Sequence, residues 1–120
     1  MTPETIDLEL QALKETHGEV STAAGLPGQV LLRIEKAILP AGCKPAETSV
    51  LLVLHGGQRP ALYVEPGIRL PNGAVPRSTS SVQVAGVEWM QFSYTFPYDE
   101  NTHTLVQFVE TSLRRFAKAE

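Results

Sequence analysis

The sequence predicts a single α+β domain over residues 1–120, with an N-terminal helix, an antiparallel meander of three or four strands, a long flap loop and a C-terminal helix. Three observations predict it. Both ends of the chain carry apolar residues at helical spacing, and the middle carries short apolar runs separated by proline and glycine. The length of 120 residues also suits one hydrophobic core. Such an order of elements is typical of a sheet covered by helices.

The first predicted element is a helix that begins near Pro3 and ends at His17. Proline is favoured in the first helical turn, and Gly18 follows the last turn as a stop signal. Three apolar residues share one face, namely Ile6, Leu10 and Leu13. The acidic residues of the same segment are interpreted as a solvated face rather than as an acid/base pair; they are Glu4, Asp7 and Glu9.

The next predicted elements are strands. Apolar and polar residues alternate in "QVLLRIEKAIL" (29–39), which we expect to pair with "EVST" (19–22). The segment "PAGCKPAE" (40–47) contains two prolines and a glycine, so it is predicted to be a loop. A central strand, "TSVLLVL" (48–54), and a shorter one, "ALYVE" (61–65), follow.

The rest of the chain is predicted as a loop, an aromatic segment and a helix. Four turn signals and a polar cluster between Pro66 and Gly86 predict a long loop or flap. The aromatic segment 87–98 fits a strand or an irregular core wall. Asn101 or Thr102 is expected to cap the last helix. Its apolar face consists of Leu105, Phe108, Val109, Leu113 and Phe116.

Composition excludes several classes of function. The net charge of −3 gives no basic field for nucleic acid, and no apolar run approaches the roughly 18 residues of a membrane span. Cys43 is the only cysteine, so no intramolecular disulfide forms, and the three histidines have no metal-ligand spacing. These features predict a cytoplasmic protein without metal or cofactor.

The segment His55-Gly56-Gly57 resembles the His-Gly-Gly segment of lipases and esterases, whose backbone amides help to form an oxyanion hole. A serine hydrolase of that kind also needs a Gly-x-Ser-x-Gly elbow, which this sequence lacks. We therefore interpret the two glycines as a hairpin connection that tolerates positive φ.

Four motifs occur in an order that resembles a known superfamily. They are Leu39-Pro40-Ala41-Gly42, "SVLLVL" (49–54), "YVEPGIRL" (63–70) and "EWMQFS" (88–93). From Leu39 to the C-terminus the chain resembles the ubiquitin-conjugating-enzyme fold and its RWD-type relatives. It is most similar to a bacterial family found beside ubiquitin-like proteins. The resemblance implies a ubiquitin-like protein, its activating enzyme or a JAB-type isopeptidase as partner.

The resemblance also implies where a catalytic flap belongs. Active relatives carry His-Pro-Asn and, about eight residues later, a thioester cysteine. This chain offers Leu70-Pro71-Asn72, with Asn72 in the place of the oxyanion-stabilising asparagine, then Ser80 and Ser81 where the cysteine belongs, and Trp89 beyond. A serine does not form the exchangeable thioester that transfer requires, because thiolate is the better nucleophile and leaving group.

The leading hypothesis is therefore a non-catalytic binding module, with the first helix and the flap as its contact surfaces. The expected binding residues are Leu70, Pro71, Asn72, Ser80, Ser81 and Trp89. One alternative is an active conjugating enzyme that uses Cys43, beside Lys44, as a displaced nucleophile. Another is a self-associating scaffold that pairs through an exposed strand edge.

Overall fold

The computed structural model describes residues 3–24, 27–55, 60–71, 73–74, 79–84, 86–92 and 103–115. It contains two helices and six strands in these residues. In chain order they are α1 (Pro3–His17), β1 (Val20–Ala24), β2 (Gln29–Ile38), β3 (Glu47–His55), β4 (Ala61–Val64), β5 (Thr79–Val84), β6 (Val87–Phe92) and α2 (Leu105–Arg114). The α+β class and both terminal helices are thus as predicted.

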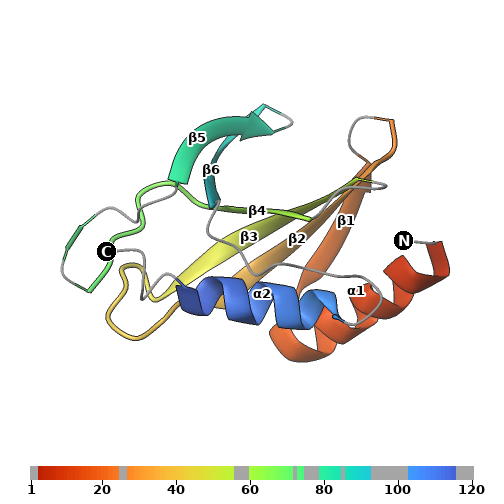
Figure 1. The fold of residues 1–120 in the computed structure, drawn as a ribbon, viewed down its shortest axis with the longest axis horizontal. Helices are drawn as coiled ribbons and strands as arrows, with labels where there is room; N and C mark the ends of the chain where they lie inside the picture. The colour runs from red at the N-terminus through yellow and green to blue at the C-terminus, as the bar shows by residue number, and fades with distance from the viewer. Residues whose placement is uncertain are drawn as a thin grey trace.

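The six strands form one antiparallel sheet in the order β1-β2-β3-β4-β6-β5. The pairing expected between the segment after the first helix and the long alternating strand is confirmed, since Val20 lies opposite Ile34. Both helices lie on the same side of the sheet, and the β5–β6 hairpin bends away from it at the far end (Figure 1). The fold therefore has a helical layer over one face only of the sheet.

The main hydrophobic core lies between the helices and the sheet. Strand residues at alternate positions supply one side of it, and the apolar stripe predicted for the last helix supplies the other. Its largest fully buried side chains are Phe92, Phe108, Leu13, Leu32, Ile34, Leu52, Leu62, Ile68, Leu70, Leu105 and Val50. A smaller cluster on the opposite face contains Leu31, Leu51 and Trp89.

A β-bulge interrupts β2 where it pairs with β3. Ile34 lies opposite Val50, but the next pair is Ala37 opposite Thr48, so β2 has one extra residue. Because side chains alternate along a strand, the extra residue exchanges the two faces beyond it. Ala37 and Leu39 are buried as a result, and Ile38 points outward with 77% of its surface exposed.

The N-terminus of α2 differs from the prediction. Its N-cap is Thr104, rather than Asn101 or Thr102, which lie outside the described residues. The Thr104 hydroxyl accepts a hydrogen bond from the Gln107 backbone N–H at 3.1 Å, and the Gln107 side chain accepts one from the Thr104 N–H at 2.9 Å. This reciprocal pair is a capping box, which needs Gln or Glu three residues after the cap.

A residue of the first helix completes the same helix end. The Glu9 carboxylate accepts a hydrogen bond from the Leu105 N–H, which has no partner within α2 because it lies in the first turn. The negative charge also suits the positive end of the α2 dipole. Glu9 is therefore a link between α1 and α2, whereas the sequence analysis placed it on a solvated face.

The prediction of one long loop from Pro66 to Gly86 is wrong in its second half. Residues 79–84 form β5, which pairs with β6 along its whole length from Thr79 to Val84. Gly86, with φ of 80°, forms part of the turn of this hairpin. The sheet consequently has six strands, not three or four.

Candidate functional site

Two of the motif segments that carry the resemblance lie side by side in the structure. The backbones of Lys44 and Arg69 exchange two hydrogen bonds, of 2.9 and 2.8 Å. Gly42 packs against the ring of Pro71 so closely that a Cβ at Gly42 would lie 3.0 Å from it. Gly42 also has φ of 90°, which favours glycine. The turn after β2 and the segment after β4 thus form one unit.

The single cysteine, Cys43, lies in the turn after β2 and its side chain is buried. Cys43 is 4% exposed and packs in the main core, and its backbone N–H donates to the Pro40 carbonyl at 3.2 Å. Burial raises the pKa of the Cys43 thiol, because a desolvated thiolate is disfavoured. A thiol of this kind is a poor nucleophile at neutral pH.

The other predicted site residues do not gather around Cys43. Leu70 is buried in the same core, and Pro71 is exposed beside Gly42. Ser80 and Ser81 are exposed on the edge strand β5, opposite Gln91 and Met90. Asn72 lies outside the described residues, as do Gly56 and Gly57.

Trp89 lies on the opposite face of the sheet from Cys43 and Leu70. It is 3% exposed and packs with Leu31 and Leu51 under the bend of the β5–β6 hairpin. The guanidinium carbon of Arg33 lies 5.2 Å from the centroid of its ring, within the range of a cation–π contact. The expected binding residues are therefore divided between two faces.

A shallow hollow adjoins this tryptophan on the face that carries no helix. It has a volume of about 160 Å³ and is lined by Ser21, Thr22, Ala23, Leu31, Arg33, Leu51, Val84, Val87 and Trp89. Arg33 Nε lies 3.0 Å from Glu35 Oε1 but makes no hydrogen bond of acceptable geometry, so the contact is an ion pair only. The hollow is small compared with a typical ligand pocket of about 300–1,000 Å³.

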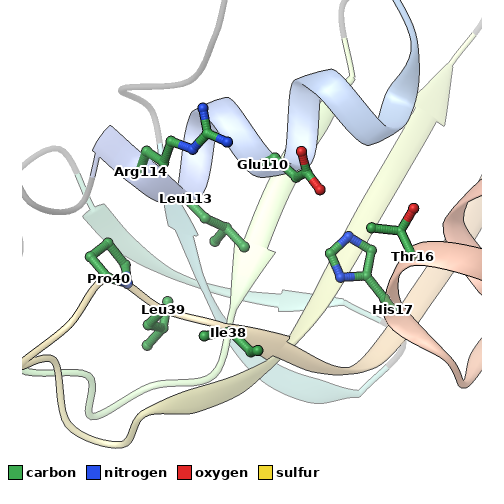
Figure 2. Close-up of a pocket in the computed structure, with 8 residues that line it drawn as sticks. All are labelled: Thr16, His17, Ile38, Leu39, Pro40, Glu110, Leu113 and Arg114. Atoms are coloured by element: carbon green, nitrogen blue, oxygen red, sulfur yellow. The ribbon is translucent and has the colours of Figure 1, made fainter.

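A larger pocket of about 570 Å³ lies where the C-terminal ends of both helices meet the end of β2. It is lined by Thr16, His17, Ile38, Leu39, Pro40, Glu110, Leu113 and Arg114. Figure 2 shows Glu110 and Arg114 along α2, His17 on the Glu110 side, and Ile38 and Leu39 on the strand segment that faces Leu113. We call it the α1–α2 pocket. Sequence reasoning missed it, because its residues come from three separate segments and form no motif.

His17, at one end of the α1–α2 pocket, has one ring nitrogen without a hydrogen-bond partner among the described residues. Nε2 of His17 is inaccessible to solvent and has no hydrogen-bond partner among the residues the structure describes. Burial lowers the pKa of His17, and the nearby Glu110 carboxylate opposes this by raising it. The net shift is downward, so the imidazole is neutral at pH 7.

Two further kinds of site are absent from the described part of the chain. It holds no group of three or more His, Cys, Asp or Glu residues that is placed to bind a metal ion. Neither described helix combines the length and apolar character needed to cross a membrane.

No protein-family model, curated protein or solved structure matches the chain.

Proposed function

We propose that this chain is a non-catalytic binding module of the ubiquitin-conjugating-enzyme type, acting in a bacterial ubiquitin-like conjugation pathway. The order of an N-terminal helix, an antiparallel sheet and a C-terminal helix is compatible with that fold. The contact between the segments of residues 39–44 and 69–71 supports it further, because both segments carry the motifs of the resemblance. Its partner is a ubiquitin-like protein, an activating enzyme or a JAB-type isopeptidase.

The burial of Cys43 is the observation that favours binding over transfer. A displaced nucleophile must reach the partner's carbonyl and must ionise, and Cys43 is buried with a raised pKa. Ser80 and Ser81 are accessible, but serine does not support thioester exchange. Both candidate positions therefore argue against thioester chemistry.

The first helix offers a contact surface that can be tested by mutation. Leu8 projects from α1 with 74% of its surface exposed, although most residues of its size are buried in this chain. The acidic residues Glu4, one helical turn before Leu8, and Asp7, directly before it in the sequence, are also exposed. An apolar side chain within an acidic surface suits a partner with a basic rim around an apolar centre.

The test is a binding titration of the full chain against the three partners of its own organism, followed by biolayer interferometry. We expect saturable binding to one partner and about a fivefold or greater loss with Leu8→Ala, from lost apolar burial. Lys14→Ala, at an exposed position on a different face of the same helix from Leu8, is the control and should bind normally. Absence of binding to all three partners would refute the proposal.

A self-associating scaffold is the second candidate function, favoured by the sheet edges. The edge strands β1 and β5 carry no charged side chain, although natural edges usually have one as protection against pairing. Light scattering across a concentration series decides it. A constant monomer mass excludes this candidate, whereas a dimer that Gln83→Lys dissociates supports it.

A further inference from the structure

The α1–α2 pocket combines an apolar floor with opposite charges at its two ends. Ile38, Leu39 and Leu113 form the floor, and Ile38 is one of the most exposed large apolar residues in the described chain. The β2 bulge turns Ile38 outward, so its side chain is available for apolar contact with a ligand in the pocket.

One end of the pocket carries a negative charge. The Glu110 carboxylate lies there beside the His17 ring, and Glu110 makes no ion pair among the described residues. Burial lowers the pKa of the imidazole, so the ring adds no positive charge at pH 7 that would offset the carboxylate. A carboxylate without an ion-pair partner suits a cationic N–H donor such as an ammonium group.

The other end presents a positive charge. Arg114 lies one turn after Glu110 on α2, about 6 Å farther along the helix axis at 1.5 Å per residue. Neither Glu110 nor Arg114 makes an ion pair with another residue in the described ranges. Both charges are therefore available to a ligand that places a positive group opposite Glu110 and a negative group opposite Arg114.

We propose that the α1–α2 pocket is a docking site for a peptide segment of a partner protein in which aliphatic residues lie between one basic and one acidic residue. The aliphatic side chains cover Ile38, Leu39 and Leu113, the basic residue faces Glu110, and the acidic residue faces Arg114. The volume of about 570 Å³ accommodates more than one side chain. This inference rests on the proposed role as a binding module, and it names the partner's chemistry at a surface distinct from Leu8.

The test uses the ¹⁵N-labelled full chain and three capped peptides that differ only in charge. Their central sequences are Lys-Leu-Leu-Glu, Lys-Leu-Leu-Lys and Glu-Leu-Leu-Glu, so the apolar part is constant. We expect the mixed-charge peptide to shift the amide signals of Thr16, His17, Ile38 and Leu113. Each mismatched charge should weaken binding about two- to fivefold, the size of a surface ion pair.

Two charge reversals of the protein supply the specificity control. Glu110→Arg should make Glu-Leu-Leu-Glu the best of the three peptides, and Arg114→Glu should favour Lys-Leu-Leu-Lys. Such a crossed pattern cannot arise from misfolding, because each variant gains one peptide while it loses another. Equal binding of all three peptides to every variant would overturn the charge assignment.

The apolar floor has its own control. Ile38→Ser should weaken the mixed-charge peptide about fivefold or more, while Val87→Ser, at a half-exposed valine beside the hollow on the opposite face, should not. No shift of pocket signals by any peptide would overturn the proposal. Because these peptides contain no partner protein, the test can fail while Leu8-dependent partner binding succeeds, and the reverse also holds.

Discussion

At the scale of single residues, Cys43 and His17 are titratable groups that the fold partly or fully removes from water. Cys43 packs in the main core, and His17 lies at the junction of α1 with α2. Burial disfavours the charged form of each group, so the pKa of the thiol rises and the pKa of the imidazole falls. Each shift has a measurable consequence.

Cys43 should react slowly with thiol reagents in the folded protein. The buried thiol is both inaccessible and largely protonated at neutral pH, so modification requires local or global opening. We expect labelling by a disulfide reagent at pH 7.5 to be slower by more than tenfold in the native chain than in the chain unfolded in guanidinium. Equal rates in the two states would show an accessible thiol and would revive the transfer hypothesis.

His17 should make the free energy of unfolding fall as the pH drops below about 6.5. The unfolded chain binds a proton at the usual pKa of 6.5, whereas the folded pKa is lower, so acid favours the unfolded state. The loss begins near pH 6.5 and levels off below the folded pKa. Urea titrations of the chain and of His17→Gln between pH 5 and 8 measure it.

The carboxylates titrate in both proteins, so the difference between the two stability curves isolates the histidine. We expect that difference to change between pH 6.5 and 5 in favour of the glutamine variant. Parallel curves over the whole range would contradict the downward shift of the His17 pKa.

At the scale of elements, the start of α2 depends on two side chains from different parts of the chain. Thr104 caps the helix from its own N-terminus, and Glu9 reaches it from α1. The Thr104 cap, the helix dipole and the contact with Glu9 therefore all stabilise the first turn of α2. This turn consequently connects the two helices.

Removal of the capping hydroxyl should destabilise the chain modestly. Thr104→Ala loses the hydrogen bond from the Gln107 N–H, which costs about 1 kcal/mol of the free energy of unfolding. Thr104→Ser retains an oxygen at the same position and should recover most of the loss. Chemical denaturation gives both values, and an unchanged midpoint for the alanine variant would contradict the assigned cap.

The elements that were predicted correctly carry their signal locally. The stripe from Leu105 to Leu113 repeats at helical spacing, and the alternation in β2 identifies a half-buried strand. β5 was missed because "TSSVQV" is mostly polar and follows several turn signals. The cap was misplaced because Asn101 and Thr102 are as good caps as Thr104 in isolation. The reciprocal bond to Gln107 distinguishes Thr104.

At the scale of the whole molecule, one sheet is shared by two hydrophobic clusters. The larger cluster lies under the helices and the smaller one lies under the β5–β6 hairpin. Strands β2 and β3 contribute to both, with Leu32 and Leu52 on one face and Leu31 and Leu51 on the other. A strand cannot leave one cluster without disrupting the other.

The two clusters should therefore unfold together. Trp89 is the only tryptophan, so its fluorescence reports on the smaller cluster, while far-UV circular dichroism is dominated by the helices. We expect the two signals to give the same urea midpoint. Val109→Ala, which removes about 2 kcal/mol from the helical side, should lower both midpoints equally. An unchanged urea midpoint by fluorescence in Val109→Ala, with a lowered midpoint by circular dichroism, would contradict this coupling.

The candidate sites could be predicted less well than the fold, and the reason also lies at this scale. The expected binding residues Leu70, Pro71, Ser80, Ser81 and Trp89 are close in sequence, yet the sheet divides them between two faces and an edge. The α1–α2 pocket draws on residues 16–17, 38–40 and 110–114. Only the folded chain brings these three segments together.

Which side chains of β2 line the pocket floor depends on the difference in length between β2 and β3 at the bulge. Between Ile34 and Ala37 the strand holds one position more than β3 can match. If β3 gained a matching residue between Thr48 and Val50, the two strands would pair without a bulge and the side chains of β2 would alternate regularly from Ile34 onward. Ile38 would then face inward and Leu39 outward, with no side chain of β2 altered. Homologues should therefore be aligned by the length of this segment before their pocket residues are compared.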